Sequence, residues 1–374
     1  MSDEAVLFEE RASQADKRIG IATLNCEKTL NSLTHNMVRL LHDKLRQWQT
    51  DEAIACVFIQ GAGSRALCAG GDVQQLYQSA IAKPGGPCVE AEAFFELEYR
   101  MDFLLHRYPK PVICWGHGVV MGGGLGILAA CSHRVVTEKT RVAMPEVTIA
   151  LYPDVGGSWF LNRMPGRVGL FLALTAAQMN GADCVYTGVA DRFITNSYQQ
   201  ALLEELSSIQ WSEHSDVHAE QVTKLLRKFE AKSTADRPAG NVPQHYDTIQ
   251  SLTDQDNFYQ IVDAITTVQT DDPWLQRASA GLAHGSAISA SNIYQALEKT
   301  LHMSLAEVFQ FELMLSTNVV RHPEFAEGVR ALLIDKDKNP RWQYASVRDV
   351  PGQLMDAMVT PPWPKNPLAD IAAQ

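Results

Sequence analysis

The first half of the chain alternates between short apolar runs and longer amphipathic stretches. The runs at 55–60 and 111–115 are almost continuously apolar, which predicts strands that are covered on both faces. Shorter runs at 6–10, 19–24 and 134–137 predict further strands. Since strands alternate with helical patterns, the chain is expected to form an α/β core with right-handed crossovers.

Helical spacing is clearest over 34–50, where Thr34 is placed to be the N-cap. Two more helices are predicted, a long one over 90–107 and a short one over 125–130. The first of the three is supported by apolar residues that recur every three or four positions: Met37, Leu40, Leu41, Leu45 and Trp48.

The pattern changes after about Leu202, where strand signals fade. The polar segment 232–244, KSTADRPAGNVPQ, contains proline and glycine and is interpreted as a linker. Helical spacing follows at 254–265, 287–301 and 305–319. We therefore predict an α/β part over 1–230 and a mainly helical region over 245–374.

Composition and charge narrow the classes of function. The chain has 374 residues and a formal net charge of −11, which argues against a sequence-independent grip on nucleic acid. No stretch approaches the roughly 18 apolar residues of a membrane span. The acidic N-terminus lacks an apolar leader, and the seven cysteines form no CxxC pair. We expect reduced thiols and a cytoplasmic protein without a membrane or nucleic-acid partner.

Two glycine-rich turns carry the first candidate chemistry. The segment 119–126, VVMGGGLG, follows the strand at 111–115 and opens a helix, and 68–72, CAGGD, also precedes a helix. Unpaired N–H groups at such turns can hold an oxyanion. Gly124 to Ala129 also fits the GxGxxA pattern of dinucleotide binding, and plain helix packing is a further alternative. An acidic ribose partner is not evident, because Glu138 comes too soon and Glu146 follows a proline.

Two residues near these turns have simple structural interpretations. Cys68 has no evident histidine partner, so we expect a small buried residue and not a nucleophile. Asp72 is expected to cap the helix that follows it. The histidines show no HExxH or HxH pattern, and His106, His117 and His133 are interpreted as structural. We predict no metal site.

Two carboxylates downstream of the glycine turns form the second candidate feature. Glu146 follows Pro145 among apolar neighbours, and Asp154 lies in 151–157, LYPDVGG. A buried glutamate has a raised pKa and can act as a base, whereas an exposed one has no such role. Asp154 could equally be a turn or N-cap residue. Their spacing makes them a candidate pair.

Taken together, the motifs resemble those of the crotonase (enoyl-CoA hydratase/isomerase) superfamily. The resemblance rests on KTLNSLT at 28–34, CAGGD at 68–72, HGVVMGGGLG at 117–126 and MPE at 144–146. Within the superfamily the chain is most similar to the 3-hydroxyisobutyryl-CoA hydrolase branch. That similarity rests on FFELEY at 94–99, YPDVGG at 152–157 and EGVRALLIDKD at 327–337.

The resemblance implies a spiral of ββα repeats with a helical C-terminal region. It implies an oxyanion hole made by the backbone N–H groups of Gly71 and Gly123, which bind the carbonyl of a CoA thioester. Gly123 would also contact the substrate. Glu146 would be the catalytic carboxylate with Asp154 as its partner, and Glu98 would hold a substrate hydroxyl. Contacts with CoA would come from Lys28, Leu30, Ala66 and Ala69.

One departure from the superfamily pattern bears on the reaction. Hydratases of the superfamily carry a first catalytic glutamate three residues after the oxyanion-hole glycine, and that position here is Gly126. Adding water to a C=C bond uses two carboxylates, one as base and one as acid, so hydration loses a partner. Asp154, which stands where typical hydratases have a small residue, fits hydrolysis.

The resemblance therefore leads us to expect hydrolysis of a short, branched 3-hydroxyacyl-CoA, with 3-hydroxyisobutyryl-CoA of valine breakdown as the best candidate. No cofactor is expected, since CoA is part of the substrate. A homo-oligomer, trimer or hexamer, is expected from the same resemblance. Hydratase or isomerase activity is one alternative, and a non-catalytic acyl-CoA-binding protein is another.

Overall fold

The computed structural model describes residues 4–373, which divide into two compact units. Unit 1 comprises the described residues up to Gly71 together with Met101–Val142 and Met179–Pro243. Unit 2 comprises Asp72–Arg100, Ala143–Gln178 and the described residues from Gln244 onward. The chain therefore passes between the units several times, and each unit is described by itself.

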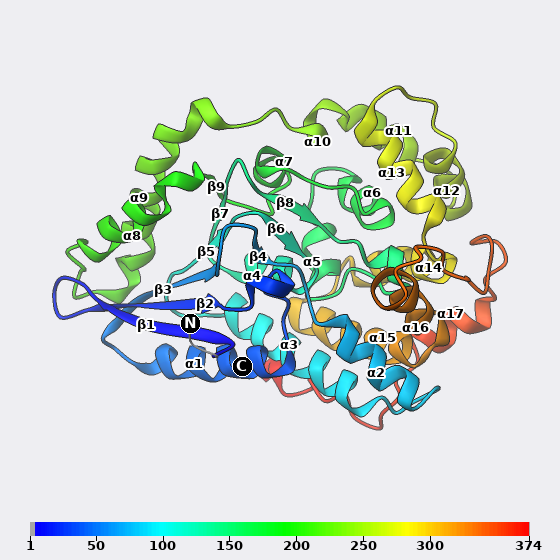
Figure 1. Cartoon of the computed structure of the whole chain (residues 1–374), viewed down its shortest axis with the longest axis horizontal. Coiled ribbons are helices and arrows are strands. Elements are labelled where there is room, and N and C mark those ends of the chain that lie inside the picture. The colour runs from blue at the N-terminus through cyan, green and yellow to red at the C-terminus, as the bar shows by residue number, and fades with distance from the viewer. Residues whose placement is uncertain (1–3, 374) are drawn as a thin grey trace. The chain divides into compact units, whose positions relative to one another are not determined.

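Unit 1 is built on a six-stranded sheet in the order β1-β2-β3-β5-β7-β9 (Figure 1). Strands β1 and β2 pair antiparallel, and the other neighbouring strands of this sheet pair in parallel. A three-stranded sheet has the order β4-β6-β8. The strands are β1 Val6–Ala12, β2 Arg18–Leu24, β3 Ile54–Gly61, β4 Ala66–Cys68, β5 Val112–Gly116, β6 Val119–Met121, β7 His133–Val136, β8 Arg141–Ala143 and β9 Arg192–Phe193.

A strand–strand–helix repeat builds both sheets. Strand β3 is followed by β4 and helix α2, β5 by β6 and α4, and β7 by β8 and the short helix η2. Each repeat thus places one strand in each sheet before its helix. This is the predicted spiral of ββα repeats.

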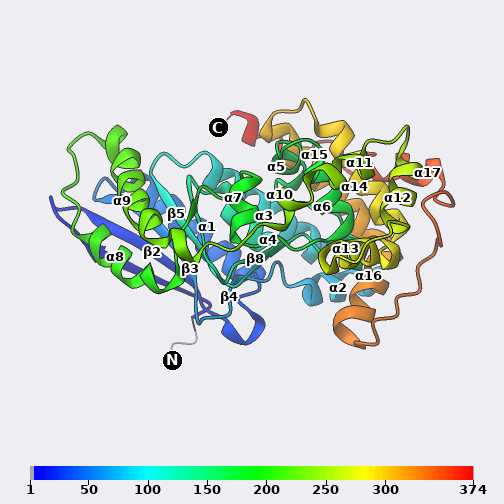
Figure 2. The same cartoon turned by 90° about the horizontal axis from the view of Figure 1, so that it is seen from above.

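Helices cover both sides of β1 to β3 (Figures 1 and 2). Helix α1 begins after Thr34, whose hydroxyl accepts a bond from the Met37 N–H as predicted. Helices α8 and α9 bury their apolar faces against the strands, with Trp115, Leu206 and Phe229 in one core cluster. The helices that begin in unit 1 are η1 Glu27–Thr29, α1 His35–Thr50, α4 Gly123–Ala130, α7 Gly181–Tyr186, η3 Asn196–Tyr198, α8 Gln199–Ser207, η4 Ser215–Val217, α9 His218–Ser233, η5 Thr234–Asp236 and α10 Asn241–Gln244.

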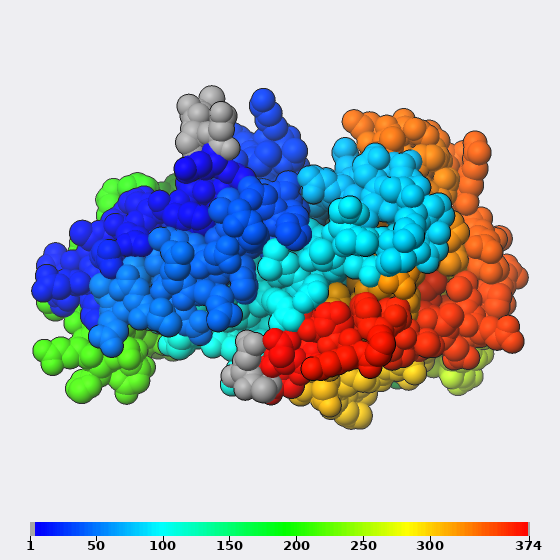
Figure 3. Space-filling model, turned by 90° about the horizontal axis from the view of Figure 1, so that it is seen from below, coloured from blue at the N-terminus to red at the C-terminus, as the bar shows by residue number. Residues whose placement is uncertain are grey.

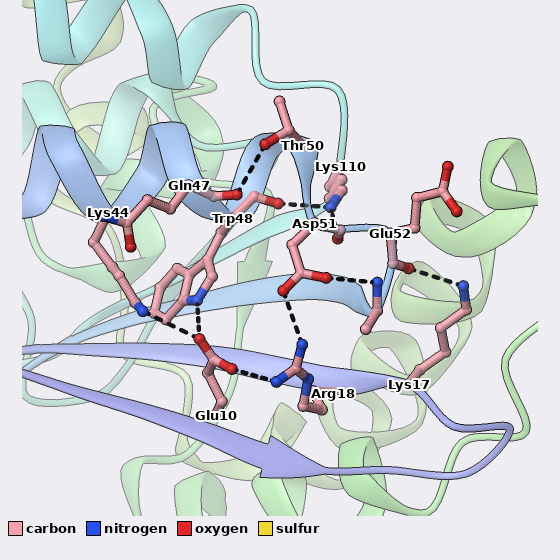
Figure 4. A network of polar contacts seen from close by, with 11 residues as sticks. Glu10, Lys17, Arg18, Lys44, Gln47, Trp48, Thr50, Asp51, Glu52 and Lys110 are labelled. Atoms are coloured by element: carbon pink, nitrogen blue, oxygen red, sulfur yellow. Dashed lines mark hydrogen bonds and ion pairs between the residues drawn. The ribbon is translucent and has the colours of Figure 1, made fainter.

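A polar network joins the end of α1 to the strands beside it (Figure 4). Glu10 accepts hydrogen bonds from Trp48 Nε1 at 2.8 Å, Arg18 at 2.7 Å and Lys44 at 3.1 Å. Arg18 also bonds Asp51, at 2.8 Å. The indole hydrogen bond of Trp48, with the contributions of Lys44 and Arg18, lowers the pKa of Glu10. The network holds a carboxylate in its charged form.

Unit 2 is mainly helical. Helix α15 is capped by a reciprocal pair, Ser304 and Glu307. The C-terminal segment packs beside α3, where Arg100 bonds Asp370 and the carbonyl of Pro367 (Figure 3). The helices that begin in this unit are α2 Val73–Ala82, α3 Val89–His106, η2 Glu146–Ile149, α5 Gly157–Leu161, α6 Val168–Thr175, α11 Tyr246–Thr253, α12 Phe258–Thr266, α13 Pro273–His284, α14 Ala287–Thr300, α15 Leu305–Arg321, α16 Pro323–Val329, the π-helix η6 Arg330–Ile334, α17 Gly352–Met358 and η7 Ile371–Ala373.

The division into units differs from the predicted one, because 72–100 and 143–178 of the predicted α/β part belong to unit 2, and 231–243 belong to unit 1. The predicted linker is ordered against unit 1: Asp183 accepts a bond from the Val242 N–H at 2.7 Å, and Thr195 donates to Asp236 at 2.7 Å. Polar composition alone cannot distinguish a free linker from a segment that the fold binds. The helical character predicted for 245–374 is confirmed, although α12 begins at Phe258 because Asn257 is its N-cap. Within residues 4–373, none of the helices combines the length and apolarity that crossing a bilayer requires.

Candidate active site

The two glycine turns lie against each other in unit 1. A Cβ atom at Gly124 would come within 2.4 Å of the carbonyl oxygen of Cys68, and one at Gly70 would lie 3.7 Å from the Gly123 nitrogen. Gly70 also has a φ of 106°, which favours glycine. Only glycine permits this close approach, which brings the two glycine-rich turns into contact.

Gly123 and Gly71 are placed at the ends of regular structure. Gly123 is the first residue of α4, where helical N–H groups have no partner inside the helix. The N–H groups of Leu125 and Gly126 already bond the Gly122 carbonyl, at 2.8 and 3.0 Å. Gly71 forms an isolated parallel bridge with Leu33 and directly precedes Asp72. The two N–H groups stay a prediction for the oxyanion hole.

Three of the four residues predicted to contact CoA come together beside these turns. The Ala69 N–H donates to the Leu30 carbonyl at 3.0 Å. The Ala66 carbonyl accepts from the Asn31 amide at 3.0 Å. Lys28 lies exposed on η1.

A basic pocket of about 500 Å³ adjoins Leu30. Its cations come from two segments, Arg65 before β4 and Lys139 and Arg141 beside β8. All three are exposed, and Arg65 donates to the Glu27 carbonyl at 2.6 Å. The lining residues are Leu30, Ser64, Arg65, Gly118, Val119, Lys139 and Arg141. The sequence analysis did not identify these cations, which precede CAGGD and MPE in the chain.

Unit 2 carries the two predicted carboxylates. Glu146 opens η2 after Pro145 and is 5% exposed. Its Oε2 atom is buried and has no hydrogen-bond partner within the described part of the chain. Burial, and after it the nearby charge of Asp154, raises the pKa of Glu146 well above its ordinary value. A buried carboxyl group with a raised pKa is a candidate for proton transfer.

Asp154 is buried as well, at 4% exposed, and is held on a strained turn. Tyr99 on α3 donates to its Oδ2 at 2.6 Å. The next residue, Val155, has a φ of 53°, and Gly156 has a φ of 79°. A β-branched residue in the left-handed region costs about 1–3 kcal/mol, and such strain concentrates at functional sites. Burial raises the pKa of Asp154 to about 6, although the Tyr99 hydrogen bond lowers it.

Helix α15 holds this turn through the side chain and the carbonyl group of Glu312. Glu312 accepts hydrogen bonds from the N–H groups of Gly156 at 2.7 Å and Ser158 at 2.9 Å. The Tyr152 hydroxyl donates to the Glu312 carbonyl at 2.7 Å. Glu312 is fully buried, and burial raises its pKa to about 8 against the effect of the two N–H groups. The Tyr152 side chain before Asp154 and the backbone after it are therefore tied to one residue of α15.

Glu98, predicted to bind a substrate hydroxyl, lies buried on α3. A structural interpretation of Glu98 is an ion pair with Arg100 or Arg107. Arg100 pairs with Glu96 at 3.1 Å and Asp370 at 2.9 Å. Glu98 is buried in unit 2, which also contains Glu146 and Asp154. Its binding of a substrate hydroxyl stays a prediction.

The residues with structural interpretations are placed as expected. Asp72 caps α2 through the Gln74 N–H, and all seven cysteines are free thiols, six of them buried. His117 bonds the Gly63 carbonyl at 3.1 Å and His133 bonds Thr223 at 3.0 Å. Over residues 4–373, no group of three or more His, Cys, Asp or Glu side chains is placed to hold a metal ion.

The dinucleotide alternative gains no support from this geometry. All eight residues of α4 are buried, and its first turn packs on the CAGGD turn. Glu138, the nearest acidic candidate, accepts a bond from the Asn196 N–H at 2.8 Å. Glu138 therefore binds the backbone just after β9, and the glycines allow the two turns to pack closely.

The sequence did not predict the residues that hold Asp154 and its turn in place. Tyr99 lies in the motif FFELEY and Tyr152 in YPDVGG, but neither motif indicates a function for its tyrosine. Nothing predicted a role for Glu312 or Ser316. The available signal was a pair of polar residues four positions apart inside the apolar pattern of 305–319. That signal does not say what the pair touches.

Comparisons with known proteins agree with this architecture. The enoyl-CoA hydratase/isomerase family model matches residues 19–359. The chain is 35% identical over 352 residues to the mitochondrial 3-hydroxyisobutyryl-CoA hydrolase of Danio rerio, covering 94% of this chain and 88% of that protein. To the human protein of the same name it is 33% identical over 348 residues, covering 93% and 86%.

A solved structure is similar over nearly the whole chain. The crystal structure of a carnitinyl-CoA dehydratase from Mycobacterium thermoresistibile superposes with a TM-score of 0.84 at 32% identity, covering 98% of this chain and 99% of that one. The match includes both the glycine turns and the helical region after residue 245. The predicted fold class is thereby confirmed, and the chain belongs to the enoyl-CoA hydratase/isomerase (crotonase) family.

Proposed function

We propose that this protein is an acyl-CoA thioester hydrolase that converts 3-hydroxyisobutyryl-CoA to 3-hydroxyisobutyrate and CoA, a reaction of valine breakdown. The names of the Danio rerio and human relatives support this substrate. The observation that carries the proposal is the buried Glu146–Asp154 pair with raised pKa values, in a chain whose residue 126 is glycine. Two buried carboxyl groups with raised pKa values can handle the protons of a hydrolysis.

The first step is polarisation of the thioester carbonyl. In the proposal, the N–H groups of Gly71 and Gly123 bind its oxygen and stabilise the negative charge that develops there. The support is the contact of the two glycine turns and the position of Gly123 at the start of α4. Removing one such donor from an oxyanion hole typically costs about 10²–10³-fold in kcat.

The second step is attack on the carbonyl carbon. Glu146 either attacks to give a mixed anhydride or takes a proton from the attacking water. Asp154, which is ionised at the start, accepts the proton that Glu146 or the attacking water loses, orients water, and passes a proton to the leaving thiolate of CoA. Water supplies the acid oxygen, the C–S bond breaks, and CoA leaves as the thiol. No redox partner enters, so the reaction proceeds without a cofactor in this proposal.

Two further contacts give specificity. Glu98 accepts a hydrogen bond from the substrate 3-hydroxyl group. The basic pocket of Arg65, Lys139 and Arg141 holds phosphate groups of CoA, since three exposed cations beside Leu30 suit an anionic ligand. Contacts from Lys28, Leu30, Ala66 and Ala69 position the rest of CoA. We further propose a cytoplasmic homo-oligomer, although the curated relatives named above are mitochondrial.

Enoyl-CoA hydration is the second candidate, because the family includes hydratases. Gly126 argues against it, since this buried position of α4 offers no side chain where hydratases have a glutamate. A non-catalytic acyl-CoA-binding protein is the third. The burial of both Glu146 and Asp154 argues against it, because a binding protein gains nothing from two costly buried carboxyl groups.

A free-thiol release assay over a small panel of CoA esters tests the proposal. The panel contains 3-hydroxyisobutyryl-CoA, isobutyryl-CoA, acetyl-CoA and crotonyl-CoA, with loss of crotonyl-CoA absorbance followed in parallel. We expect the hydroxyacyl ester to give the highest kcat/KM. Faster hydration of crotonyl-CoA than thiol release from any ester would favour the hydratase, and binding without turnover would favour the binding protein.

A further inference from the structure

Three hydroxyl groups form a line that ends on Asp154. Tyr99 Oη lies 2.6 Å from Asp154 Oδ2 and 2.7 Å from Ser316 Oγ. Ser316 Oγ in turn lies 2.9 Å from Tyr152 Oη. Tyr99, Tyr152 and Ser316 are fully buried, and they come from α3, the Asp154 turn and α15.

Counting protons gives this line a direction. Each hydroxyl has one proton, and an ionised carboxylate has none. When Asp154 is ionised, Tyr99 donates to it, so the Tyr99 oxygen accepts from Ser316. Ser316 then has no second proton, and Tyr152 must be the donor in their contact. Tyr152 shares that proton with the Glu312 carbonyl at 2.7 Å. Every dipole in the line points toward Asp154.

Helix α15 holds the line in place. Glu312 and Ser316 are four residues apart and therefore lie on the same face of the helix. Glu312 ties down the N–H groups of Gly156 and Ser158, and Ser316 reaches Tyr99 and Tyr152. The Tyr99 hydroxyl is thus fixed by α15 before it meets Asp154, and its donation needs little reorganisation.

The groups facing Asp154 have different effects on its ionised form. They are Tyr99 on α3, Tyr152 on the same turn, Glu146 on η2 and Glu312 on α15. Two of these are carboxyl groups, which disfavour a charge on Asp154, and Tyr99 is the side chain that donates to it. Glu146 has no comparable donor at its buried Oε2 within the described part of the chain.

We propose that Tyr99 is a positioning residue of the hydrolysis: its hydroxyl, oriented by Ser316, holds the Asp154 side chain in place and stabilises its ionised form, so that Asp154 loses its proton before Glu146 does. This inference rests on the proposed function for its role in turnover. The order of proton loss is a property of the free protein and can be measured without any substrate.

The test is a carboxyl-carbon NMR titration of the full chain labelled with ¹³C-aspartate and ¹³C-glutamate. The Asp154→Asn and Glu146→Gln spectra assign the two signals. We expect Asp154 to titrate below Glu146 in the wild-type protein. In Tyr99→Phe, loss of a hydrogen bond to a charged acceptor raises the Asp154 pKa by about one to two units.

Tyr152→Phe is the matched control, since it removes the same atom two hydrogen bonds farther from Asp154. We expect its effect to be less than about half of the Tyr99→Phe shift. Ser316→Ala, which removes the donor to Tyr99, is expected to raise the Asp154 pKa by less than about one unit and serves if Tyr99→Phe does not fold. An unchanged Asp154 pKa in the folded variants, equal shifts in both tyrosine variants, or Glu146 titrating first would overturn the inference.

Turnover gives the second readout. The acid limb of the kcat/KM profile is expected to move upward with the Asp154 pKa in Tyr99→Phe. At pH 7 the ionised fraction then falls, and kcat falls by about two- to tenfold with KM nearly unchanged. An acid limb that stays in place despite the NMR shift would remove Tyr99 from the reaction. Absence of thiol release in the wild-type protein would instead overturn the proposed function and leave the titration result standing.

Discussion

Two carboxylates in this molecule accept a hydrogen bond from an aromatic residue, and their surroundings give them opposite properties. Glu10 accepts from the Trp48 indole at 2.8 Å, and Asp154 accepts from the Tyr99 hydroxyl at 2.6 Å. Glu10 also pairs with Arg18 and Lys44 near the surface, and its pKa is lowered. Asp154 is buried beside Glu146, and its pKa is raised to about 6. A similar donor therefore stabilises a permanently ionised carboxylate at Glu10, and it contacts a carboxyl group with a raised pKa at Asp154.

The difference comes from what else surrounds each carboxylate. Cations and water keep Glu10 ionised at neutral pH, so the Glu10 network can only stabilise the fold. Burial removes water from Asp154 and from Glu146, which makes ionisation costly and raises the pKa of both carboxyl groups. Proton transfer needs such groups, and a structural ion pair does not.

The largest effect is expected at Glu146. Glu146→Gln keeps the shape of the side chain but can neither attack nor accept a proton. We expect kcat for thiol release to fall about 10²–10⁴-fold, with CoA-ester binding nearly unchanged. Glu10→Gln is the matched control from the other network and should leave kcat within about twofold. Retention of more than about a tenth of the wild-type rate in Glu146→Gln would assign the chemistry to another group.

A smaller effect, specific to the substrate, is expected at Glu98. A hydrogen bond to a charged acceptor contributes about 1.5–3 kcal/mol, so Glu98→Ala should lower kcat/KM for 3-hydroxyisobutyryl-CoA by about 10–150-fold and spare isobutyryl-CoA. Glu96→Ala, which removes a nearby α3 carboxylate that binds Arg100, is the control. An equal loss for both esters would mean that Glu98 shapes the fold or the pocket without binding the hydroxyl.

The basic pocket should show the behaviour of exposed charges. Lys139→Ala and Arg141→Ala each remove a cation whose contribution is expected to be about 0.2–1 kcal/mol, so KM for CoA esters should rise by about 1.5–5-fold at low salt. The increase should shrink as salt is added, because the charges are exposed. Lys17→Ala, at a distant cation of the Figure 4 network, is the control. A KM that is insensitive to both substitutions and to salt would place the CoA phosphates elsewhere.

The smallest effect is expected on stability. Glu10 has a pKa below its ordinary value of 4.5 in the folded chain, so its contacts stabilise the fold above about pH 4.5. That stabilisation is lost as the pH falls through the lowered pKa. Glu10→Gln should therefore cost up to about 1 kcal/mol at pH 7 and progressively less on acidification. Denaturant unfolding of both proteins across this range measures the difference.

The sign is opposite for the buried carboxylates. Glu146 and Glu312 have raised pKa values, so their ionisation makes the fold less stable as the pH rises from about 4.5 toward those values. Glu10→Gln leaves this second trend in place, which separates the two regions in one experiment. A stability difference that does not change with pH would show that Glu10 contributes by packing and not by charge.

Much of the architecture follows from local pattern. The 55–60 and 111–115 runs are the buried strands β3 and β5, and the capped helix after Thr34 is α1. Strands β4, β6 and β8 were not predicted, since three residues carry too little periodicity. The segment 232–244, interpreted as a linker, contains the boundary between the two units, but its hydrogen bonds to residues such as Asp183 could not be predicted because these residues lie far away in the sequence.

The candidate site also has features that local sequence predicts and features that depend on contacts between distant residues. The sequence by itself determined the glycine turns, the presence of Glu146, Asp154 and Glu98, and the missing carboxylate at Gly126, because these depend on residue type and short spacing. Only the tertiary structure decided that Tyr99 meets Asp154 across 55 residues and Ser316 across 217. It also decided which carboxylates are buried. Desolvation and donor geometry depend on all the packed neighbours at once, so the direction in which each pKa moves could be determined only from the folded chain.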